Sequence, residues 1–346
     1  MAEPTLAELT TLRLGGPPRR LLDAVTEAEI VAAVREAEDP VLVLAGGSNL
    51  VIADAGFPGT VVRIGTQGIE ERAEDGRVLL EVQAGEPWDP LVARAVAAGL
   101  SGIECLSGIP GSVGASPIQN VGAYGQEVAE TIAGLRVLDR AAGEVQELEP
   151  EAAGFTYRSS AFKRTPGRWV VLAVTFALER RELSGPIRYA ELARSLGVRP
   201  GEGAPLAEVR EAVLALRRGK GMVLDPGDPD SVSAGSFFTN PILEESAFGR
   251  LEDRAGEDGR PPRFPEPDGR VKTSAAWLIE RAGFTRGYGN PEGIAISSKH
   301  TLALTNRGGG TTAELVALAR EIAAGVRERF GVELQPEPVL VGERWP

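Results

Sequence analysis

Apolar residues along the chain follow two spacings, one typical of β-strands and the other of amphipathic α-helices. The run VLVLAGGSNLVI, at 41–52, predicts two strands on either side of a glycine turn. Two helix starts carry capping boxes: Thr26 with Glu29, opening a helix to about residue 37, and Thr311 with Glu314. The other predicted helices cover 87–98, 206–218, 274–282 and 312–330, and the other strands cover 60–64, 77–84, 135–139, 145–148, 169–178, 293–296, 301–305 and 332–341.

These elements mix helices and strands without the regular strand–helix–strand alternation of a doubly wound parallel sheet. The predicted fold class is therefore α+β. The chain has 346 residues, which is enough for two or three domains of about 100–200 residues each.

The segment SGIPGSVGASPIQNVGAYG, at 107–125, is unusual because it is long, neutral and rich in glycine. It holds five glycines and two prolines, and no charged residue occurs from Cys105 to Gln126. Loops beyond about 12–15 residues are uncommon in compact domains and are functional or disordered when they occur. Apolar residues such as Ile109 and Val113 favour an ordered segment. Glycines let backbone N–H groups approach a ligand closely, which indicates a phosphate-bearing cofactor.

The composition excludes several other classes of protein. The net charge is −12, so we expect neither nucleic acid nor an anionic membrane surface as a partner. One cysteine, Cys105, and one histidine, His300, exclude an internal disulfide and a zinc site of the usual Cys/His type. The N-terminal residues lack a basic stretch followed by an apolar one, and no apolar run nears the roughly 20 residues of a membrane span. We therefore expect a cytoplasmic location.

Several motifs admit both a plain and a functional interpretation. Gly308–Ala313 formally matches a dinucleotide-binding G-x-G-x-x-A, but only one strand follows it, so we interpret it as a turn before the capping box. The turn Ala45–Asn49 is either a simple β-turn or a loop that contacts a diphosphate. Arg158 is either a surface residue or a ligand contact. Arg217, Arg218 and Lys220 are typical of the solvated end of a helix.

Two polar residues occur in unusual surroundings. Ser236 precedes two phenylalanines in GSFFTNP, where a hydroxyl is unfavourable unless it has partners. Glu337 lies between Pro336 and Pro338, which suits an edge strand that holds the carboxylate rigidly.

Taken together, these motifs resemble the UDP-N-acetylenolpyruvoylglucosamine reductases, the MurB flavoenzymes of peptidoglycan precursor synthesis. The resemblance is to the first type of this family, with Tyr189 in the expected loop at 183–204. Nine motifs follow the family's order over nearly the whole chain: LRLGG (12–16), LAGGSNLV (44–51), IPGSVGASPIQNVGAYG (109–125), YRSSAFK (157–163), RYAEL (188–192), LRRGKG (216–221), SAGSFFTNP (233–241), VKTSAAWLIERAG (271–283) and PEP (336–338).

The resemblance implies a two-part FAD-binding module of the vanillyl-alcohol-oxidase or PCMH type, followed by an α+β substrate-binding domain. The implied domains are a first FAD-binding part at 1–65, completed by a C-terminal strand in 331–346, a second at 66–216, and the substrate-binding domain at 217–330.

The resemblance also implies non-covalent FAD. A covalent link usually needs His or Cys, and only His300 and Cys105 are present. The implied cofactor-binding residues are Gly46, Gly47, Ser48, Asn49, Ile109, Pro110, Gly111, Ser112, Gly114, Ala115, Ser116, Ile118, Gln119, Asn120, Gly122 and Arg158.

By the same resemblance, NADPH reduces FAD and leaves, and UDP-N-acetylglucosamine enolpyruvate then binds in its place. Hydride passes to C3 of the enolpyruvyl group, which gives UDP-N-acetylmuramate. Arg158 and Glu337 are implied to stabilise the charge that builds on the substrate, and Ser236 to protonate C2. The implied substrate contacts are Tyr157, Arg158, Tyr189, Lys220, Ser236, Asn240 and Glu337.

Two other functions remain open on the residues alone. An FAD-linked oxidase of the same fold, acting on an alcohol or sugar, would need no acid at Ser236 and would reduce oxygen quickly. A binding protein for nucleotide sugars would have lost Arg158, Ser236 or Glu337, and all three are present. We expect a UDP-N-acetylmuramate dehydrogenase that acts as a monomer.

Overall fold

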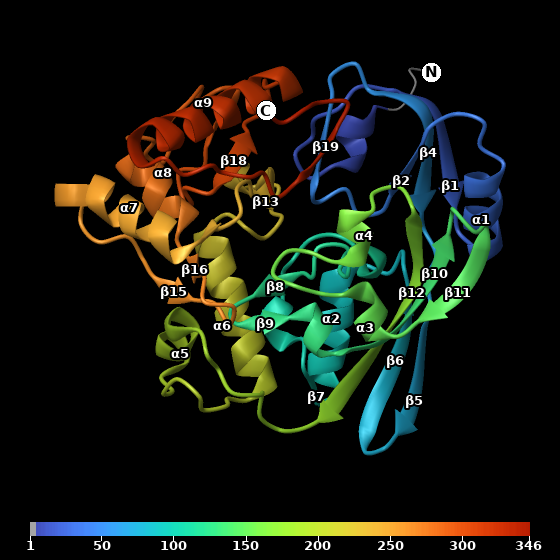
Figure 1. Cartoon of the computed structure of the whole chain (residues 1–346). Helices are drawn as coiled ribbons and strands as arrows, with labels where there is room; N and C mark the ends of the chain where they lie inside the picture. The colour runs from blue at the N-terminus through green and yellow to red at the C-terminus, as the bar shows by residue number, and fades with distance from the viewer. Residues whose placement is uncertain (1–4) are drawn as a thin grey trace. The chain divides into compact units, whose positions relative to one another are not determined.

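The computed structural model describes residues 5–346, which form two compact units built from interleaved segments (Figure 1). The N-terminal unit comprises Pro18–Gly47 and Phe57–Gly219. The C-terminal unit comprises the described residues up to Pro17, Ser48–Gly56 and Lys220–Pro346. Within residues 5–346 no helix has both the length and the apolar character needed to cross a bilayer.

The N-terminal unit begins with a small parallel sheet in the order β1-β4-β2. Its helix α1 (Glu27–Arg35) buries Ile30 and Val34. Thr26 and Glu29 form the predicted capping box, so this helix start is confirmed. The sheet strands are β1 (Pro18–Ala24), β2 (Val41–Leu44) and β4 (Phe57–Ile64).

A larger antiparallel sheet, in the order β11-β10-β12-β6-β5, forms the main layer of this unit. Helix α2 (Trp88–Ala97) buries Trp88, whose ring meets Phe176 edge-on with centroids 5.8 Å apart. The strands are β5 (Ile69–Glu74), β6 (Arg77–Gln83), β10 (Ile132–Asp139), β11 (Glu144–Leu148) and β12 (Trp169–Arg180), with β7 (Leu100–Ser101) paired to the end of β12.

Helices α5 (Ala190–Leu196) and α6 (Leu206–Gly219) form a separate apolar cluster in the same unit. The prediction of α6 is confirmed. The sequence did not predict α5, because its seven residues give little periodicity. The short elements of this unit are α3 (Pro150–Ala153), α4 (Ala161–Arg164), β8 (Gly122–Ala123), β9 (Gln126–Glu127) and the 3-10 turns Glu104–Leu106, Val113–Ala115 and Val128–Glu130.

The C-terminal unit packs three helices around an antiparallel sheet in the order β13-β18-β17. Its core includes Phe248 of α7 and Leu278 of α8, together with Ile322 of α9. A small sheet in the order β14-β16-β15 lies in the same unit. The elements are β13 (Ser233–Ser236), β14 (Ile242–Leu243), α7 (Glu245–Ala255), β15 (Phe264–Pro265), β16 (Val271–Lys272), α8 (Ala275–Arg281), β17 (Ile294–Ile296), β18 (Ala303–Asn306) and α9 (Thr312–Phe330), with 3-10 turns at Leu6–Leu9, Pro229–Ser231 and Gly256–Asp258.

The end of the chain pairs with a segment from near its beginning. Strand β19 (Val339–Val341) runs parallel to β3 (Leu50–Ile52), with Val339 opposite Leu50. The predicted strand over 332–341 was too long. Pro336 and Pro338 have no N–H to donate, so regular pairing begins only after them. The mixture of antiparallel and parallel sheets with helices confirms the predicted α+β class.

The start of α9 offers a test of local stability. Thr311 Oγ1 accepts a hydrogen bond from Glu314 N at 3.2 Å, and Glu314 Oε2 accepts one from Thr311 N at 2.8 Å. We expect Thr311→Ala to lower the free energy of unfolding by about 1 kcal/mol, the usual cost of losing such a cap. Urea unfolding of the FAD-loaded protein, followed by circular dichroism, measures this. Ser246→Ala at an exposed position of α7 is the control, and equal losses in both variants would contradict the assignment.

Candidate functional site

The neutral glycine-rich segment is ordered, as predicted, and contains little regular structure. Its last part is a hairpin of β8 and β9 in which Ala123 pairs with Gln126. Tyr124 and Gly125 form the two-residue turn, with φ of +50° and +83°. Positive φ at both positions is the property of a type I′ turn, which suits the twist of a hairpin.

Asp89 of α2 fixes the beginning of this segment. Its Oδ1 accepts a hydrogen bond from Gly108 N at 2.6 Å, and Arg210 of α6 binds both of its oxygens, at 2.7 and 2.9 Å. Burial opposes ionisation, but the Arg210 and Gly108 hydrogen bonds outweigh it and hold the pKa of Asp89 below its ordinary value. Asp89 therefore remains charged and joins two helices to the loop.

The two predicted cofactor loops of the N-terminal unit meet at Gly46 and Gly111. A Cβ added to Gly46 would lie 2.5 Å from Gly111 Cα and 2.9 Å from its carbonyl carbon. Neither neighbour is a flexible side chain, so only glycine fits at this position. The adjacent Ser112 Oγ is buried and has no hydrogen-bond partner among residues 5–346. A glycine contact beside an unpartnered buried hydroxyl fits the phosphate-bearing part of FAD.

Arg158 lies in a tight turn beside the end of the neutral segment. Its φ is +53°, a left-handed value that is uncommon for a residue other than glycine. Its Nη2 donates to Gly122 O at 2.7 Å, and its guanidinium carbon lies 5.2 Å from the centre of the Tyr157 ring. The structure therefore brings Tyr157, Arg158 and Gly122 together.

Asn120 and Ser160 hold this turn in place. Asn120 Nδ2 donates to Glu127 Oε2 at 2.7 Å and to Thr156 O at 3.2 Å. Ser160 Oγ is buried and donates to Ile118 O at 2.6 Å. The side chain of Asn120 thus joins the loop to the Arg158 turn.

Tyr189 packs against a tyrosine that the sequence did not single out. Its ring meets that of Tyr124 edge-on, with centroids 5.3 Å apart and planes at 85°. Tyr189 keeps 43% of its surface exposed, whereas burial raises the pKa of Tyr124 to about 12. Nothing around Tyr124 in the sequence distinguishes it from other loop tyrosines, because the contact depends on residues far apart in the chain.

The expectation of a solvated helix end at Arg217 is wrong. Arg217 is 8% exposed, and burial lowers its pKa while the nearby Tyr124 and Asp89 oppose that shift. Helix α6 turns this residue inward, next to the cluster around Tyr124. Arg218, by contrast, is exposed.

Three predicted residues of the C-terminal unit lie on neighbouring segments. Glu337 N donates to Phe237 O at 2.8 Å, which places Glu337 next to Ser236 in adjoining segments. On its other side, Asn49 O accepts from Val339 N at 2.9 Å, and Asn49 Nδ2 donates to Glu337 O at 3.4 Å. Ser236, Glu337 and Asn49 are thus held together by backbone pairing.

Asn240 and Lys220 belong to the same unit. Asn240 Oδ1 accepts a hydrogen bond from Ala275 N at 3.0 Å, at the start of α8. Lys220 is half-buried and precedes Gly221, whose backbone packs on Asp230. Sequence reasoning missed Asp230, although the charged run DPGDPD directly before β13 was a signal.

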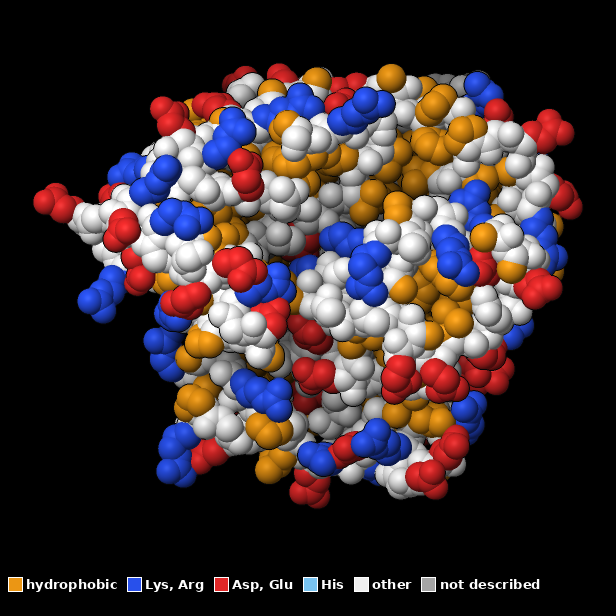
Figure 2. Space-filling model, viewed as in Figure 1, with side chains coloured by type: hydrophobic (Ala, Val, Ile, Leu, Met, Phe, Trp, Pro, Cys, Tyr) orange, Lys and Arg blue, Asp and Glu red, His pale blue; other side chains and the backbone are white. Residues whose placement is uncertain are grey.

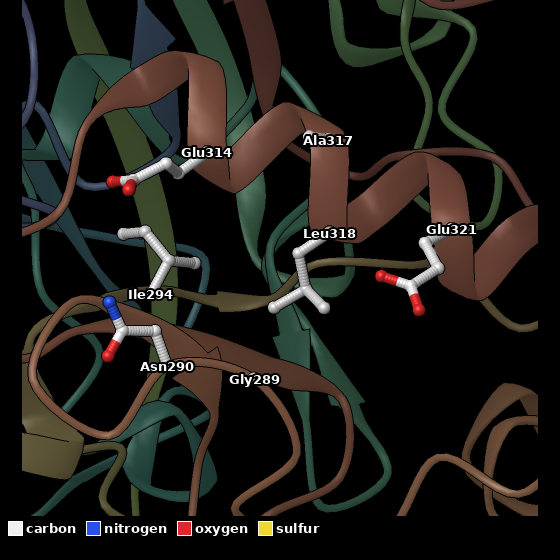
Figure 3. A pocket seen from close by; sticks show the side chains of 7 residues that line it. All are labelled: Gly289, Asn290, Ile294, Glu314, Ala317, Leu318 and Glu321. Carbon is white, nitrogen blue, oxygen red and sulfur yellow. The ribbon is translucent and has the colours of Figure 1, made fainter.

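A separate hollow of about 270 Å³ lies between α9 and the segment that leads into β17 (Figure 3). None of the predicted site residues lines it. Its lining residues are Gly289, Asn290, Ile294, Glu314, Ala317, Leu318 and Glu321.

Charges of both signs are interspersed over the face drawn in Figure 2, without a continuous basic surface there. In the described part of the chain no group of three or more His, Cys, Asp or Glu side chains is arranged to hold a metal ion.

Comparison with known proteins identifies the family. Residues 228–341 match the model of the UDP-N-acetylenolpyruvoylglucosamine reductase C-terminal domain, and residues 18–149 match that of an FAD-binding domain. The chain is 58% identical to the UDP-N-acetylenolpyruvoylglucosamine reductase of Salinispora arenicola, over 98% of this chain and 95% of that protein. It is 59% identical to the reductase of the same name from Streptomyces coelicolor, over 97% and 89%.

The chain belongs to the UDP-N-acetylenolpyruvoylglucosamine reductase family. A crystal structure of the reductase (MurB) from Thermus caldophilus is 26% identical, with a TM-score of 0.67 over 98% of this chain and 97% of that one. The resemblance drawn from the nine motifs is confirmed, as are the fold class and the FAD cofactor. The FAD-binding match spans Gly46 and the neutral segment up to Gly125.

The contact of Gly46 with Gly111 yields a prediction about cofactor retention. We expect Gly46→Ala to push the two loops apart and to lower the FAD content of the purified protein, because the added methyl would meet backbone. The ratio of flavin to protein absorbance, with titration of the apoprotein by FAD, measures this.

Gly185→Ala is the matched control, because a Cβ there meets nothing within 4 Å. It should retain wild-type FAD content. Full FAD occupancy in Gly46→Ala would show that the contact is not needed for binding.

Proposed function

We propose that Arg158, Ser236 and Glu337 carry the chemistry of the family's reaction in this chain. As a member of the family, the chain is an FAD-dependent oxidoreductase, UDP-N-acetylmuramate dehydrogenase. It uses NADPH to reduce UDP-N-acetylglucosamine enolpyruvate in peptidoglycan precursor synthesis. This membership decides against the FAD-linked oxidase and the nucleotide-sugar-binding protein.

One observation carries the assignment of the acid. The hydrogen bond from Glu337 N to Phe237 O holds the residue after Ser236 in register with Glu337, although the two are far apart in sequence. A hydroxyl and a carboxyl group on two paired segments are suited to move a proton and to stabilise charge at one substrate carbon.

Bound FAD supplies two-electron hydride transfer, from NADPH to C3 of the enolpyruvyl group. The residues proposed to hold it are Gly46, Gly47, Ser48, Asn49, Ile109, Pro110, Gly111, Ser112, Gly114, Ala115, Ser116, Ile118, Gln119, Asn120, Gly122 and Arg158. The Gly46–Gly111 contact and the buried Ser112 Oγ support this assignment.

Hydride addition at C3 leaves negative charge at C2 that spreads into the carboxylate of the substrate. We assign its stabilisation to Arg158 and Glu337. The Arg158 guanidinium matches the shape of a carboxylate, and its bond to Gly122 O holds it in one orientation. Glu337 acts in its protonated form or by sharing a proton.

Ser236 is assigned to protonate C2. Serine is a weak acid, so it can act only on a strongly basic carbon that is held close to it. Gly235 has a φ of +74°, which breaks the regular pairing of β13 with β18 directly before Ser236. This local turn favours presentation of the hydroxyl out of the strand.

Tyr189 and Lys220 are assigned to the diphosphate of the substrate, and Tyr157 and Asn240 to other substrate groups. The exposure of Tyr189 suits a residue that closes over a ligand.

We further propose a cytoplasmic monomer with three parts: 1–65 with 331–346, 66–216 and 217–330. The pairing of β19 with β3 supports the return of the C-terminal strand to the first part. Light scattering of the purified protein tests the monomer.

We expect Tyr189→Phe and Lys220→Ala to raise the KM for the enolpyruvyl nucleotide by about 10- to 150-fold. Loss of a hydrogen bond to a charged group costs about 1.5–3 kcal/mol. Steady-state kinetics and flavin content measure the effect. Tyr288→Phe is the control, since Tyr288 bonds Glu321 away from the proposed site. A loss of FAD with an unchanged KM would refute the assignment.

We expect Ser236→Ala to separate the two half-reactions. Reduction of the flavin by NADPH needs no proton on a substrate carbon, so its rate should stay within a few-fold of wild type. Reoxidation by the enolpyruvyl nucleotide should slow by about 10²–10⁴-fold, the usual contribution of a general acid. Stopped-flow absorbance of the flavin measures both rates.

Ser236→Cys is the conservative companion and should retain part of the reoxidation rate, because a thiol also donates a proton. Equal slowing of both half-reactions in Ser236→Ala would indicate a structural role. Glu337 would then be the next candidate for the acid.

A further inference from the structure

The buried carboxylate of Asp230 occurs in the sequence between two proposed substrate residues, Lys220 and Ser236. The side chain of Asp230 is 4% exposed and accepts several hydrogen bonds. They include bonds from Ser298 N at 3.0 Å, Ser298 Oγ at 2.5 Å and Arg307 Nη2 at 2.7 Å, and the Ser297 side chain also bonds the carboxylate. A buried charge is tolerated only with such partners. Ser298 precedes β18 and Arg307 follows it, so the partners come from both sides of this strand.

Asp230 also supports the backbone next to Lys220. Gly221 has a φ of +65°, and a Cβ placed on it would lie 2.9 Å from Asp230 Cβ and 3.0 Å from Asp230 O. The two segments are therefore in close contact, and the chain that leaves Lys220 packs directly on Asp230.

Asp230 is also linked to the start of β13. Val232 O accepts a hydrogen bond from Asn306 N at 3.0 Å, while the next residue, Arg307, binds the Asp230 carboxylate. Strand β13 then continues to Ser236, opposite Ala303. The last residue of β18, Asn306, and the residue after it, Arg307, thus hold the start of the strand that ends in the proposed acid.

The loop before Asp230 is closed independently. Ser231 Oγ donates to Asp225 O at 2.9 Å and to Asp228 O at 2.8 Å, and Lys299 Nζ pairs with Asp228 Oδ2 at 2.8 Å. Burial opposes ionisation of Asp230, but the Ser298 hydrogen bonds and the Arg307 charge keep its pKa below the ordinary value. Asp230 is thus a charged, fixed point in an otherwise irregular segment.

We propose that Asp230 is a positioning residue for the reductase reaction, which orients Lys220 through Gly221 and Ser236 through its clamp on β13. This inference rests on the roles proposed above for Lys220 and Ser236. Asp230 itself touches neither substrate nor cofactor in this assignment. Its effect on catalysis therefore passes entirely through those two side chains.

The first test is Asp230→Asn in the FAD-loaded enzyme, which keeps the shape and removes the charge. We expect the KM for the enolpyruvyl nucleotide to rise and flavin reoxidation to slow, each by about 10- to 100-fold, since a misplacement of about 1 Å can cost 100-fold. FAD content and the rate of flavin reduction by dithionite should match wild type. Asp258→Asn, which breaks the 2.6 Å pair with Arg329 in the same unit, is the control and should leave both kinetic values unchanged.

Double variants distinguish positioning from general destabilisation. If Asp230 acts through Lys220, the KM of Asp230→Asn/Lys220→Ala should equal that of Lys220→Ala within about twofold. The reoxidation rate of Asp230→Asn/Ser236→Ala should likewise equal that of Ser236→Ala. If the effects of the two single substitutions multiply in both double variants, the inference is overturned and the proposed function stays intact. Silent Lys220→Ala and Ser236→Ala variants would overturn the proposed roles, and the inference with them.

Ser298→Ala is the milder second variant if Asp230→Asn does not fold. It removes only the hydroxyl donor and leaves the backbone and Arg307 bonds. We expect the same direction of change in KM and reoxidation, with a smaller size. Wild-type kinetics in Ser298→Ala, together with loss of folding in Asp230→Asn, would show that Asp230 serves stability alone and would overturn the proposal.

Discussion

Direct contact between two glycine backbones is the constraint on which the N-terminal unit depends. Gly46 lies in the turn directly after β2, and Gly111 lies in the neutral loop before the hairpin of β8 and β9. Because the two backbones lie too close together for a Cβ on Gly46, the turn after β2 packs directly on the neutral loop.

Irregular segments in both units are held by single carboxylates, half-buried in Asp89 and buried in Asp230. Asp89 binds the start of the neutral loop and Arg210 of α6, and Asp230 binds Ser298 and Arg307. A loop without ladder hydrogen bonds needs other partners for its polar groups, and a carboxylate that accepts several bonds supplies them from one position. The proposed catalytic groups Arg158 and Ser236 lie in a turn and at the end of a strand, and not in the centres of regular elements.

Unusual backbone angles concentrate near the proposed ligand contacts. Asn120, Tyr124 and Arg158 all have positive φ without being glycine. Such conformations persist only where the surrounding structure determines them, and here hydrogen bonds from Asn120 and Ser160 do so. The neutral loop and the turn that contains Arg158 are thus joined by side-chain hydrogen bonds from Asn120 and Ser160.

Features that depend on near neighbours could be read from the sequence. The capping boxes at Thr26 and Thr311 are of this kind, because their hydrogen bonds join residues three apart. The glycine turn at 46–47 and the neutral loop could be recognised by composition, but the contacts that hold them come from distant residues. The inward turn of Arg217, the packing of Tyr124 on Tyr189 and the bonds of Asp230 to Ser298 and Arg307 became visible in the folded chain alone. These contacts join residues distant in the chain, and their energy depends on burial and geometry that no short stretch of sequence encodes.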